Sequence, residues 1–583
     1  MIKNISSKIT LGALTFFLTL NSCQDFIEVE PQDKLNKKQV YRDIFDADAA
    51  VVGIYGKFMG LAEKHVILNE LRADLLSPTY NADLFLQELN EHSVSEANPY
   101  ANPKDFYEVI NLCNDVLKNF KDMVEDNRMD INEYNERYSD IGILRSWIYL
   151  QLGIHYGSVP YITEPIEKID DIKDPNTYVR IPFEQLIDEL VSFAESLPYT
   201  DPYSANSTLV INVDGNNTAK FFINKECLLG DLQLWNNNYL QAAAHYKNVM
   251  ETGSGSSSDV VRFDTYRVKY ADIANNNDLA VGYLRNRAQD TYSLVNNNTQ
   301  GWKSMFVREK DALWNTEWIW SLPFDSNFAP KNPFIDLFSN QGGKYLVKPS
   351  QSAMNLWDSQ IQRNGFPYDA RGQKFSYNII NGQPVIIKYL LKYLDPTSQI
   401  PLDEFNTGGD WFLYRATKLH LRYAEAANRD NQHKIANALL NFGILSAYTV
   451  EGETDKTNIE QTKQPFPYDF DARNGDFPRY RGDWHRNGGI RGRAYLQRAE
   501  VVGDSLISIE NNLIKEGALD LAFEGNRWGD LIRIALRRND PAFLADKVYD
   551  KLVKDNNPKA NEVHTKLMNT NNWYLPFIWK VEE

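Results

Sequence analysis

Residues 225–251 read KECLLGDLQLWNNNYLQAAAHYKNVME, and this stretch decides the fold class. Apolar residues recur every three or four positions on both sides of 236–238, which is the period of an α-helix with one buried face. The three asparagines at 236–238 interrupt the pattern and favour a tight turn. The stretch therefore predicts a helical hairpin, whose helices we expect at 218–235 and 239–251.

A second predicted hairpin, over 410–429 and 432–446, repeats the register of the first. In both, a large and a small residue on the first helix are followed 13, 17 and 20 positions later by a small, a large and a small residue on the second. The positions are Leu229-Gly230 with Ala242, Tyr246 and Val249, and Tyr423-Ala424 with Ala436, Leu440 and Gly443. Tetratricopeptide (TPR) repeats have this spacing, because small residues let two helices approach and large ones fill the gaps. Two generic hairpins are the alternative, so we predict a TPR-like platform and not a long solenoid.

Helical periodicity extends over much of the remaining chain. It covers 40–62, 104–122, 133–156, 182–196, 504–522 and 529–537. Between about 252 and 409 asparagine runs and prolines interrupt it, and the alternating run at 385–389 predicts a short strand. The predicted fold class is mainly α: a TPR-like helical-hairpin platform with an irregular, loop-rich region that contains short strands.

The composition excludes several classes of function. The chain has 583 residues and a formal net charge of -16, which argues against nucleic acid and against adhesion to anionic head groups. No Cys/His spacing typical of a metal site is present, so we expect no metal and no cofactor. Cys113 and Cys227 lie in helical patterns, where buried thiols are the expected state.

The first 23 residues predict where the protein works. Lys3 and Lys8 precede an apolar run at 9–20, which is long enough for a secretory signal but too short to cross a bilayer. Cys23 closes the run and resembles the acylated cysteine of a bacterial lipobox. We expect a signal peptide at 1–22 and a lipidated tether at 23–39, with ordinary cleavage and a free Cys23 as the alternative.

Six stretches, in this order behind the cysteine, resemble motifs of the SusD/RagB family of outer-membrane lipoproteins. They are 25–31 (DFIEVEP), 144–160 (LRSWIYLQLGIHYGSVP), 183–198 (FEQLIDELVSFAESLP), 368–371 (YDAR), 421–426 (LRYAEA) and 519–533 (LDLAFEGNRWGDLIR). The resemblance covers most of the chain and implies a single SusD-like domain over 40–583. Its platform would be mainly 40–251 and 410–446, its ligand-binding loops about 252–409, and its closing helices 504–540.

The resemblance also implies a function and its partners. Proteins of this family capture oligosaccharides outside the cell and deliver them to a SusC-like TonB-dependent transporter, beside surface glycan-binding proteins and glycoside hydrolases. It implies a lipid-anchored protein of the outer membrane that faces the cell exterior and is not an enzyme. The charged residues of the motifs, such as Glu524, Asp530 and Arg533, are expected to join helices as ion pairs and not to form a catalytic couple.

The ligand class is open at this stage. Loop aromatics with nearby Asn, Asp and Arg favour a sugar, because flat rings cover the apolar face of a sugar and polar groups bind its hydroxyls. A peptide ligand, as for RagB, is the alternative, and a glycosidase is a third. The acidic chain would repel a polyanionic glycan unless a local basic patch forms, so we expect a neutral oligosaccharide.

Ligand contacts in the family come from the loops after the first helices and from the irregular middle region. On these positions we expect aromatic platforms and hydroxyl partners. The candidates are Arg72, Asp74, Tyr80, Asn81, Tyr100, Trp302, Trp357, Arg363 and Tyr368. A motif that the family has in one piece is split here between Leu440-Asn441 and 490–494, which predicts an insertion at about 442–489. We expect this insertion on the surface, in contact with ligand or transporter, with Trp484 as its main aromatic.

Overall fold

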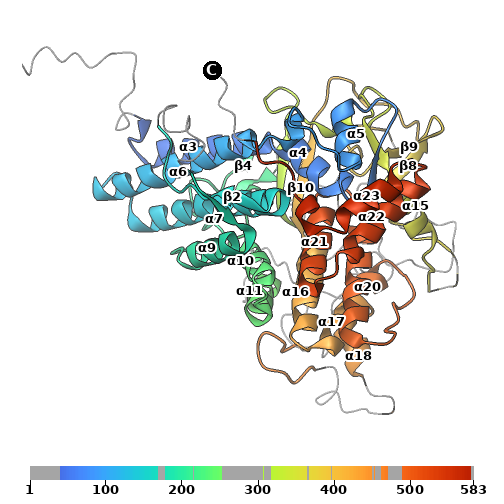
Figure 1. Ribbon diagram of the computed structural model, residues 1–583. Coiled ribbons are helices and arrows are strands. Elements are labelled where there is room, and N and C mark those ends of the chain that lie inside the picture. The colour runs from blue at the N-terminus through green and yellow to red at the C-terminus, as the bar shows by residue number, and fades with distance from the viewer. Residues whose placement is uncertain are drawn as a thin grey trace, which may run out of the picture.

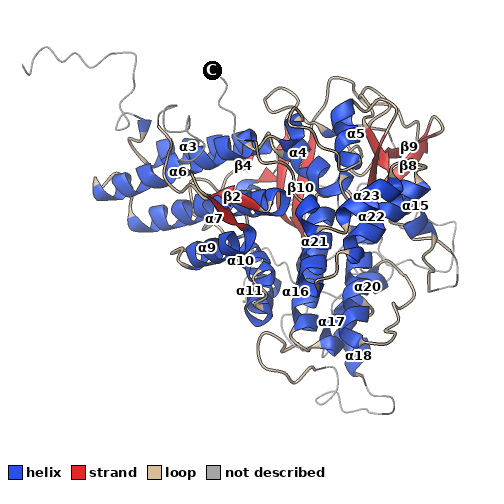
Figure 2. Cartoon of the chain, in the orientation of Figure 1, coloured by secondary structure: helices blue, strands red, loops and turns tan. Residues whose placement is uncertain are grey.

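The computed structural model describes residues 40–167, 178–213, 216–251, 306, 317–363, 365, 367–395, 397–449, 452, 461–470 and 489–578. Helices dominate this part of the chain, and strands occur only in small antiparallel pairs, so the predicted fold class is confirmed (Figures 1 and 2). In the described residues, no helix combines the length and the apolar character that a membrane span requires. Cys23 and the predicted signal peptide lie outside the described residues.

The N-terminal part is a set of antiparallel helices that pack side by side (Figure 1). Its long members are α3 (Ile44–Met59), α6 (Lys104–Glu125), α7 (Ile131–Tyr156) and α9 (Phe183–Glu195). Asp130 and Glu133 form a capping box at the start of α7, and Gly157 ends the helix with a φ of 69°. The four ranges agree with the sequence prediction to within a few residues.

The two predicted hairpins form and pack against each other. They are α10 (Lys225–Trp235) with α11 (Tyr239–Glu251) and α16 (Ala416–Arg429) with α17 (His433–Leu440). Helix α11 also packs against α16, as in consecutive TPR units. A Cβ on Gly230 would lie 2.5 Å from the ring of Tyr246, so the glycine is what lets α10 and α11 approach. The predicted close approach is therefore confirmed for the first hairpin. In the second, the helix predicted over 432–446 is wrong in its last part, because α17 ends at Leu440 and Gly443, with a φ of 84°, begins the separate helix α18 (Gly443–Tyr448).

The helix predicted over 410–429 is wrong in its first part. Residues 409–415 form β10 (Gly409–Arg415), which pairs antiparallel with β6 (Trp318–Phe324). All seven residues of β10 are buried, so both faces of the strand carry apolar side chains and the alternation typical of a strand is missing. Helix α10 likewise begins at Lys225 and not at 218, because Asn224 caps it by accepting a hydrogen bond from the Cys227 amide.

The other strands are short and bring distant segments together. The pairs are β1 (Leu76–Pro78) with β7 (Val347–Pro349), β2 (Ser158–Pro160) with β3 (Arg180–Pro182), β4 (Asn212–Val213) with β5 (Asn216–Asn217), and β8 (Tyr377–Ile380) with β9 (Gln383–Ile386). Asn381 and Gly382 connect β8 to β9 with positive φ at both positions. This is the turn that Asn-Gly favours in a two-residue hairpin.

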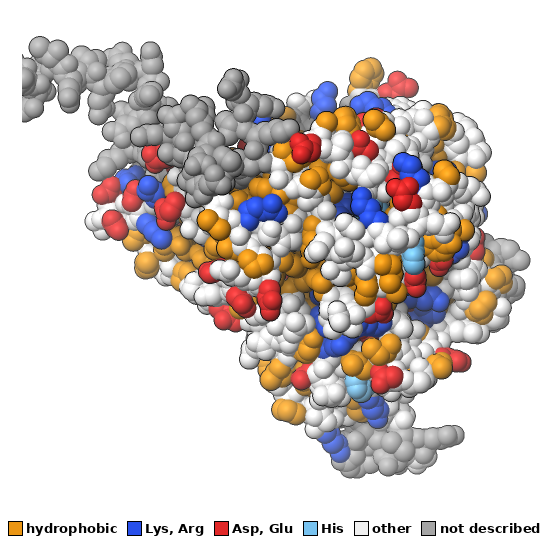
Figure 3. Space-filling view, in the orientation of Figure 1, with side chains coloured by type: hydrophobic (Ala, Val, Ile, Leu, Met, Phe, Trp, Pro, Cys, Tyr) orange, Lys and Arg blue, Asp and Glu red, His pale blue; other side chains and the backbone are white. Residues whose placement is uncertain are grey.

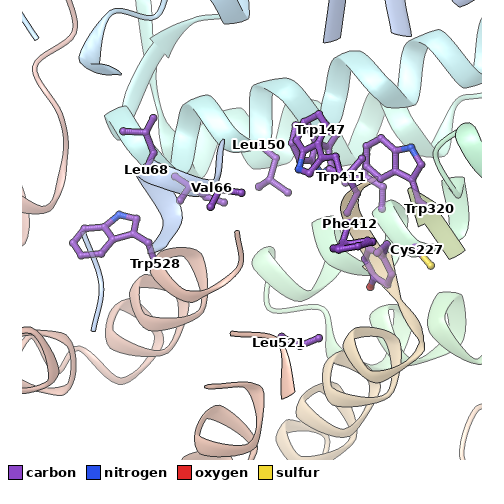
Figure 4. Close-up of a cluster of buried hydrophobic side chains, with 14 of the residues drawn as sticks. Val66, Leu68, Trp147, Leu150, Cys227, Trp320, Trp411, Phe412, Leu521 and Trp528 are labelled. Atoms are coloured by element: carbon purple, nitrogen blue, oxygen red, sulfur yellow. The ribbon is translucent and has the colours of Figure 1, made fainter. Parts of the chain in front are cut away.

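The core takes most of the tryptophans that the structure describes. Trp147 on α7 meets Trp320 and Trp411 from the β6–β10 pair, with ring centroids 5.6 and 6.4 Å away (Figure 4). Figure 4 shows Trp528 at the opposite end of the same cluster. Cys113 and Cys227 are buried and unpaired, as expected.

The C-terminal helices lie against the platform (Figure 1). They are α20 (Ser505–Asp520), α21 (Arg527–Arg538), α22 (Ala542–Lys554) and α23 (Ala560–Leu567); the last two extend the predicted closing helices, which end at 540. Short helices complete the fold: α4 (Ala62–Val66), η1 (Ile67–Leu71), α5 (Leu84–Asn90), η2 (Pro99–Ala101), η3 (Thr218–Phe221), α14 (Phe334–Phe338), α15 (Gln351–Asp358), α18 (Gly443–Tyr448), α19 (Gly489–Arg493) and η5 (Thr570–Trp573).

Buried ion pairs join these helices, as the motif charges predict. Arg533 on α21 binds Glu425 on α16 at 2.7 Å and Asp530 at 3.1 Å. Arg415 binds Glu524 at 2.9 Å and Glu317 at 2.8 Å, and all of these side chains are almost fully buried. The charged motif residues therefore stabilise the packing of helices and strands.

Part of the predicted insertion belongs to the core and not to the surface. Tyr468 and Phe470 are 3% and 5% exposed. The Tyr468 hydroxyl donates to Asp430 at 2.6 Å, and the hydroxyl of Tyr423 donates to the carbonyl of Pro467 at 2.7 Å. This segment covers the α16–α17 hairpin, which would otherwise expose its apolar face. Trp484 lies outside the described residues.

Candidate ligand-binding cleft

The structure places the predicted site residues in different surroundings. Trp302 and Trp484 lie outside the described residues and stay predictions. Trp357 is 1% exposed, and its indole nitrogen donates to the carbonyl of Leu519 at 3.0 Å. The interpretation of Trp357 as a stacking platform is therefore wrong, because the residue lies on the buried face of helix α15, in a region that we expected to be loop-rich.

Asp74 is also a structural residue. Both of its carboxylate oxygens accept hydrogen bonds from Arg527, at 2.6 and 2.8 Å. The charge of Arg527 holds the pKa of Asp74 below its usual range in spite of burial. A carboxylate that is buried and paired in this way has no free oxygen for a sugar hydroxyl, so the predicted role of Asp74 does not fit.

Tyr80 and Asn81 lie on the surface, as a binding role requires. Tyr80 is 78% exposed, and its hydroxyl accepts a hydrogen bond from Gln383 at 3.1 Å. The Asn81 side chain donates to the carbonyl of Lys344 at 2.9 Å. Tyr100 is half-buried and donates to Glu63 at 2.7 Å.

Arg363 and Tyr368 belong to another part of the surface. The guanidinium of Arg363 stacks on Phe442, 3.8 Å from the ring centroid, and its backbone amide donates to Tyr495. Tyr368 is half-buried and has a φ of 73°. Among the predicted residues that the structure describes, Arg72 is the one that lines the main cleft.

The main cleft has a volume of about 460 Å³ and is assembled from three distant parts of the chain. Arg72, His92 and Val94 come from the N-terminal helices and loops, Tyr156 and Arg180 from the end of α7 and from β3, and the rest from α23 and the segment that follows it. The volume lies within the range of small-molecule sites, which is about 300–1,000 Å³.

The C-terminal segment forms one wall of the cleft. It turns back from the closing helices toward α7, where the amide of Leu575 donates to the carbonyl of His155 at 2.8 Å (Figure 1). The ring of Tyr574 lies on Gly157, and a Cβ at that glycine would be 2.8 Å from the ring. Gly157 therefore serves both as the left-handed end of α7 and as the seat of this wall.

Arg72 forms the floor of the cleft and is 1% exposed. Its guanidinium donates to the carbonyl of Trp573, lies 3.4 Å from a ring nitrogen of His155, and stacks on Trp528 at 4.3 Å. None of the ion pairs in the described part of the chain includes Arg72, and its Nε has no hydrogen-bond partner there. Burial lowers the pKa of Arg72 to about 9, so the group keeps its charge at neutral pH.

His92 lies beside this floor and is uncharged. Its ring nitrogen is 2.9 Å from the carbonyl of Arg72, which makes the ring a donor. Burial lowers the pKa of His92 well below its usual value, and the charges of Arg72, Lys551 and Lys566 lower it further. Cations therefore surround His92, although the whole chain is acidic.

Two further cations stand at the rim. The Nε of Arg180 donates to the carbonyl of Ser158 at 3.0 Å, and its guanidinium lies 4.7 Å from the ring centroid of Phe577. Lys566 donates to the carbonyl of His92 at 2.5 Å. Asn571 and Asn572 add amide groups to the same rim. Figure 3 shows basic and hydrophobic side chains together in the middle of this face.

Among the described residues, no carboxylate lines the cleft, and no group of His, Cys, Asp and Glu could hold a metal ion. Of the lining residues, Arg72 alone is among the predicted ligand contacts. The motif at 144–160 contains Tyr156, and the extended run at 573–577 contains Tyr574 and Phe577. Neither stretch indicates that the two meet, because the C-terminal segment lies more than four hundred residues from α7.

Comparisons with known proteins bear on the fold. No protein-family model matches the sequence, and no curated protein does. Two solved SusD superfamily proteins match most of the chain. The one from Bacteroides thetaiotaomicron VPI-5482 has a TM-score of 0.54 and 16% identity, and the match covers 92% of this chain and 95% of that one. The one from Bacteroides vulgatus ATCC 8482 has a TM-score of 0.52 and 14% identity, and the match covers 92% of this chain and 98% of that one.

The chain has the SusD fold. A laminarin-binding SusD-like protein shares this fold, with a TM-score of 0.51 and 15% identity over 87% of this chain and 94% of that one. The resemblance seen in six short motifs is thus confirmed for the fold. At such low identity the SusD fold is conserved through its packing, while the lining of the cleft is free to differ.

Proposed function

We propose that this protein is a cell-surface glycan-binding lipoprotein that captures oligosaccharides and delivers them to a SusC-like TonB-dependent transporter. The observation that carries the proposal is the SusD fold over nearly the whole described chain, since one protein with this fold is a laminarin-binding protein. The cleft supports it, because Tyr574 and Phe577 offer aromatic faces beside the amides of Asn571 and Asn572. We treat residues 40–583 as one SusD-like domain.

The same proposal assigns the N-terminus to the membrane. Cys23 would carry lipid and hold the protein on the outer membrane, facing the cell exterior. The transporter would lie beneath it, and glycan-binding proteins and glycoside hydrolases of the same system would act beside it. Cys23→Ala should release the protein from membranes of cells that lack the transporter, measured by fractionation after labelling with a fatty-acid analogue. A variant that stays in the outer membrane contradicts the anchor.

A binding screen tests the function. Purified residues 24–583 would be run in affinity gels that contain defined polysaccharides and then titrated by calorimetry with oligosaccharides from those that retard the protein. We expect binding in the micromolar to millimolar range, about -4 to -8 kcal/mol, and no release of reducing ends. Retardation by no glycan, or hydrolysis of one, would count against the proposal.

The exposed pair Tyr80 and Asn81 stays a proposed second contact with the ligand. Tyr80→Ala should weaken binding without a change in stability, because Tyr80 is 78% exposed. Leu84→Ala is a matched control, since Leu84 is also exposed, at 69%, on the neighbouring helix. A RagB-like peptide carrier is the alternative, and binding of peptides in place of glycans in the same titrations would support it.

A further inference from the structure

The floor of the cleft contains a charge that the described chain does not neutralise. Arg72 is almost fully buried and its guanidinium stacks on Trp528. Its polar contacts within the described chain are the carbonyl of Trp573 and a ring nitrogen of His155. A buried cation without a paired anion destabilises a fold, because the charge loses its hydration and gains no Coulomb attraction in return. A buried, unpaired charge of this kind in a cleft is typical of a functional site, and an anion from outside would neutralise it.

The two cations at the rim also lack an ion-pair partner in the described chain. Arg180 and Lys566 donate only to backbone carbonyls, and neither takes part in an ion pair within the described ranges. One carboxylate that acts on a lining residue is Asp105, whose charge adds to the effect of burial in raising the pKa of Tyr156. Asp105 is already bound to Lys64 at 2.5 Å. Three cations thus face one cavity from three separate parts of the chain.

This rests on the proposed function: we infer that the cleft binds the anionic group of an acidic oligosaccharide, a carboxylate or a sulfate, against Arg72, Arg180 and Lys566. The Nη groups of Arg180, which bind no described residue, contact the anion directly, and Lys566 supplies a second charged donor. Arg72 adds its positive potential from beneath. Tyr574 and Phe577 pack on the sugar rings that carry the anion, and the cavity has room for a few of them.

The cations that line the cleft change the expected ligand from a neutral oligosaccharide, as the net charge predicts, to an acidic one. An acidic chain repels polyanions at long range, but within the Debye length of about 8–10 Å the nearest fixed charges dominate. The charged side chains that line the cleft in the described ranges are all positive, so an acidic sugar is favoured inside the cleft. A neutral sugar would leave the Arg72 charge uncompensated.

The test compares one glycan with and without its charge. Residues 24–583 would be titrated with a tri- to hexasaccharide of uronic acid, with its methyl ester, and with a sulfated and a neutral oligosaccharide. We expect the acid to bind at least ~10-fold more tightly than the ester, and to lose affinity as the salt concentration rises. The uronate and sulfate titrations separate the two sources of the anion.

Variants locate the effect. Arg180→Gln and Lys566→Gln should each weaken binding of the acid by ~10-fold and leave the ester unchanged. Lys559→Gln is the control, because Lys559 is an exposed cation on the adjoining segment that pairs with Glu91 outside the cleft. Equal affinity for acid and ester, or rim variants that bind like the control, overturns the inference while glycan binding stands. Binding of acidic peptides alone overturns both.

Discussion

Asp140 is a buried carboxyl group in the middle of α7, and its ionisation is coupled to folding. It accepts a hydrogen bond from the Tyr55 hydroxyl at 3.0 Å. Burial raises the pKa of Asp140 to about 7, although Lys225, the hydroxyls of Tyr55 and Tyr203, and Arg137 lower it in part. The folded state therefore holds a proton at pH 5 that the unfolded state has lost.

A pKa raised on folding stabilises the protein at low pH and ceases to do so as the pH rises through 7. The Asp140→Asn variant lacks this titration. Its free energy of unfolding, relative to the wild type, should rise by about 2 kcal/mol between pH 5 and pH 8, measured by urea denaturation. The control Asp504→Asn changes an exposed helix cap and should follow the wild type at both pH values. A constant difference between Asp140→Asn and wild type would refute the coupling.

Gly157 is a single residue that determines the position of the C-terminal wall of the cleft, because the Tyr574 ring packs directly on it. Alanine at this position is strained at φ 69° and places its Cβ 2.8 Å from the Tyr574 ring. We expect Gly157→Ala to lose about 2–4 kcal/mol of stability and to weaken ligand binding, because the C-terminal wall must move. Gly382→Ala is the control: its φ is 76°, but nothing lies within 4 Å of the added Cβ. It should cost about 1–2 kcal/mol of stability and leave binding intact. Equal losses of binding in the two variants would show that the C-terminal wall does not contribute to it.

The helical hairpin is the element that the TPR spacing specifies. Replacing a glycine by alanine should have opposite effects on stability in α10 and in α3. On α10, Gly230→Ala would press a Cβ into the ring of Tyr246, whose hydroxyl also binds Asp231 at 2.6 Å. We expect a loss of about 1–3 kcal/mol. On α3, Gly56→Ala meets nothing within 4 Å and should gain about 0.5–1 kcal/mol from helix propensity. Thermal unfolding of both variants checks the pair, and a stabilised Gly230→Ala would show that the hairpin is not closely packed there.

The whole molecule is joined by a buried network of charges that connects β10, the loop before β6 and the end of α20. Arg415 binds Glu317, Asp520 and Glu524 at 2.6–2.9 Å. Arg415→Met leaves these carboxylates with fewer cations in the interior, so we expect a loss of about 3–5 kcal/mol. The pair of the exposed Lys559 and the half-buried Glu91 is the contrast, and Lys559→Gln should change stability by less than about 1 kcal/mol. Urea denaturation of the two variants decides whether the network holds the fold together, and similar small losses would show that it does not.

The sequence predicts the local elements well because their causes are local. The periodicity over 104–122 and 133–156, the glycine after Tyr156 and the Gly230–Tyr246 spacing all depend on neighbours within one or two helices. The strand at Gly409–Arg415 escapes prediction because its burial on both faces removes the alternation that identifies a strand. The buried roles of Trp357 and Asp74 escape it for a similar reason: a single sequence does not distinguish an aromatic or a carboxylate in a loop motif from one in the core.

The sequence by itself thus determined the fold class, the close approach of α10 and α11 at Gly230, and the resemblance to SusD-like proteins, which the structural comparison confirms for the fold. Only the tertiary structure decided the cleft. Arg72, Arg180 and Lys566 are far apart in the chain, and the sign of the charge that a ligand meets depends on which residues the fold brings within a few ångströms. The net charge of -16 predicts repulsion of anions, whereas the local cations favour them, since Coulomb attraction falls with distance and with screening by salt.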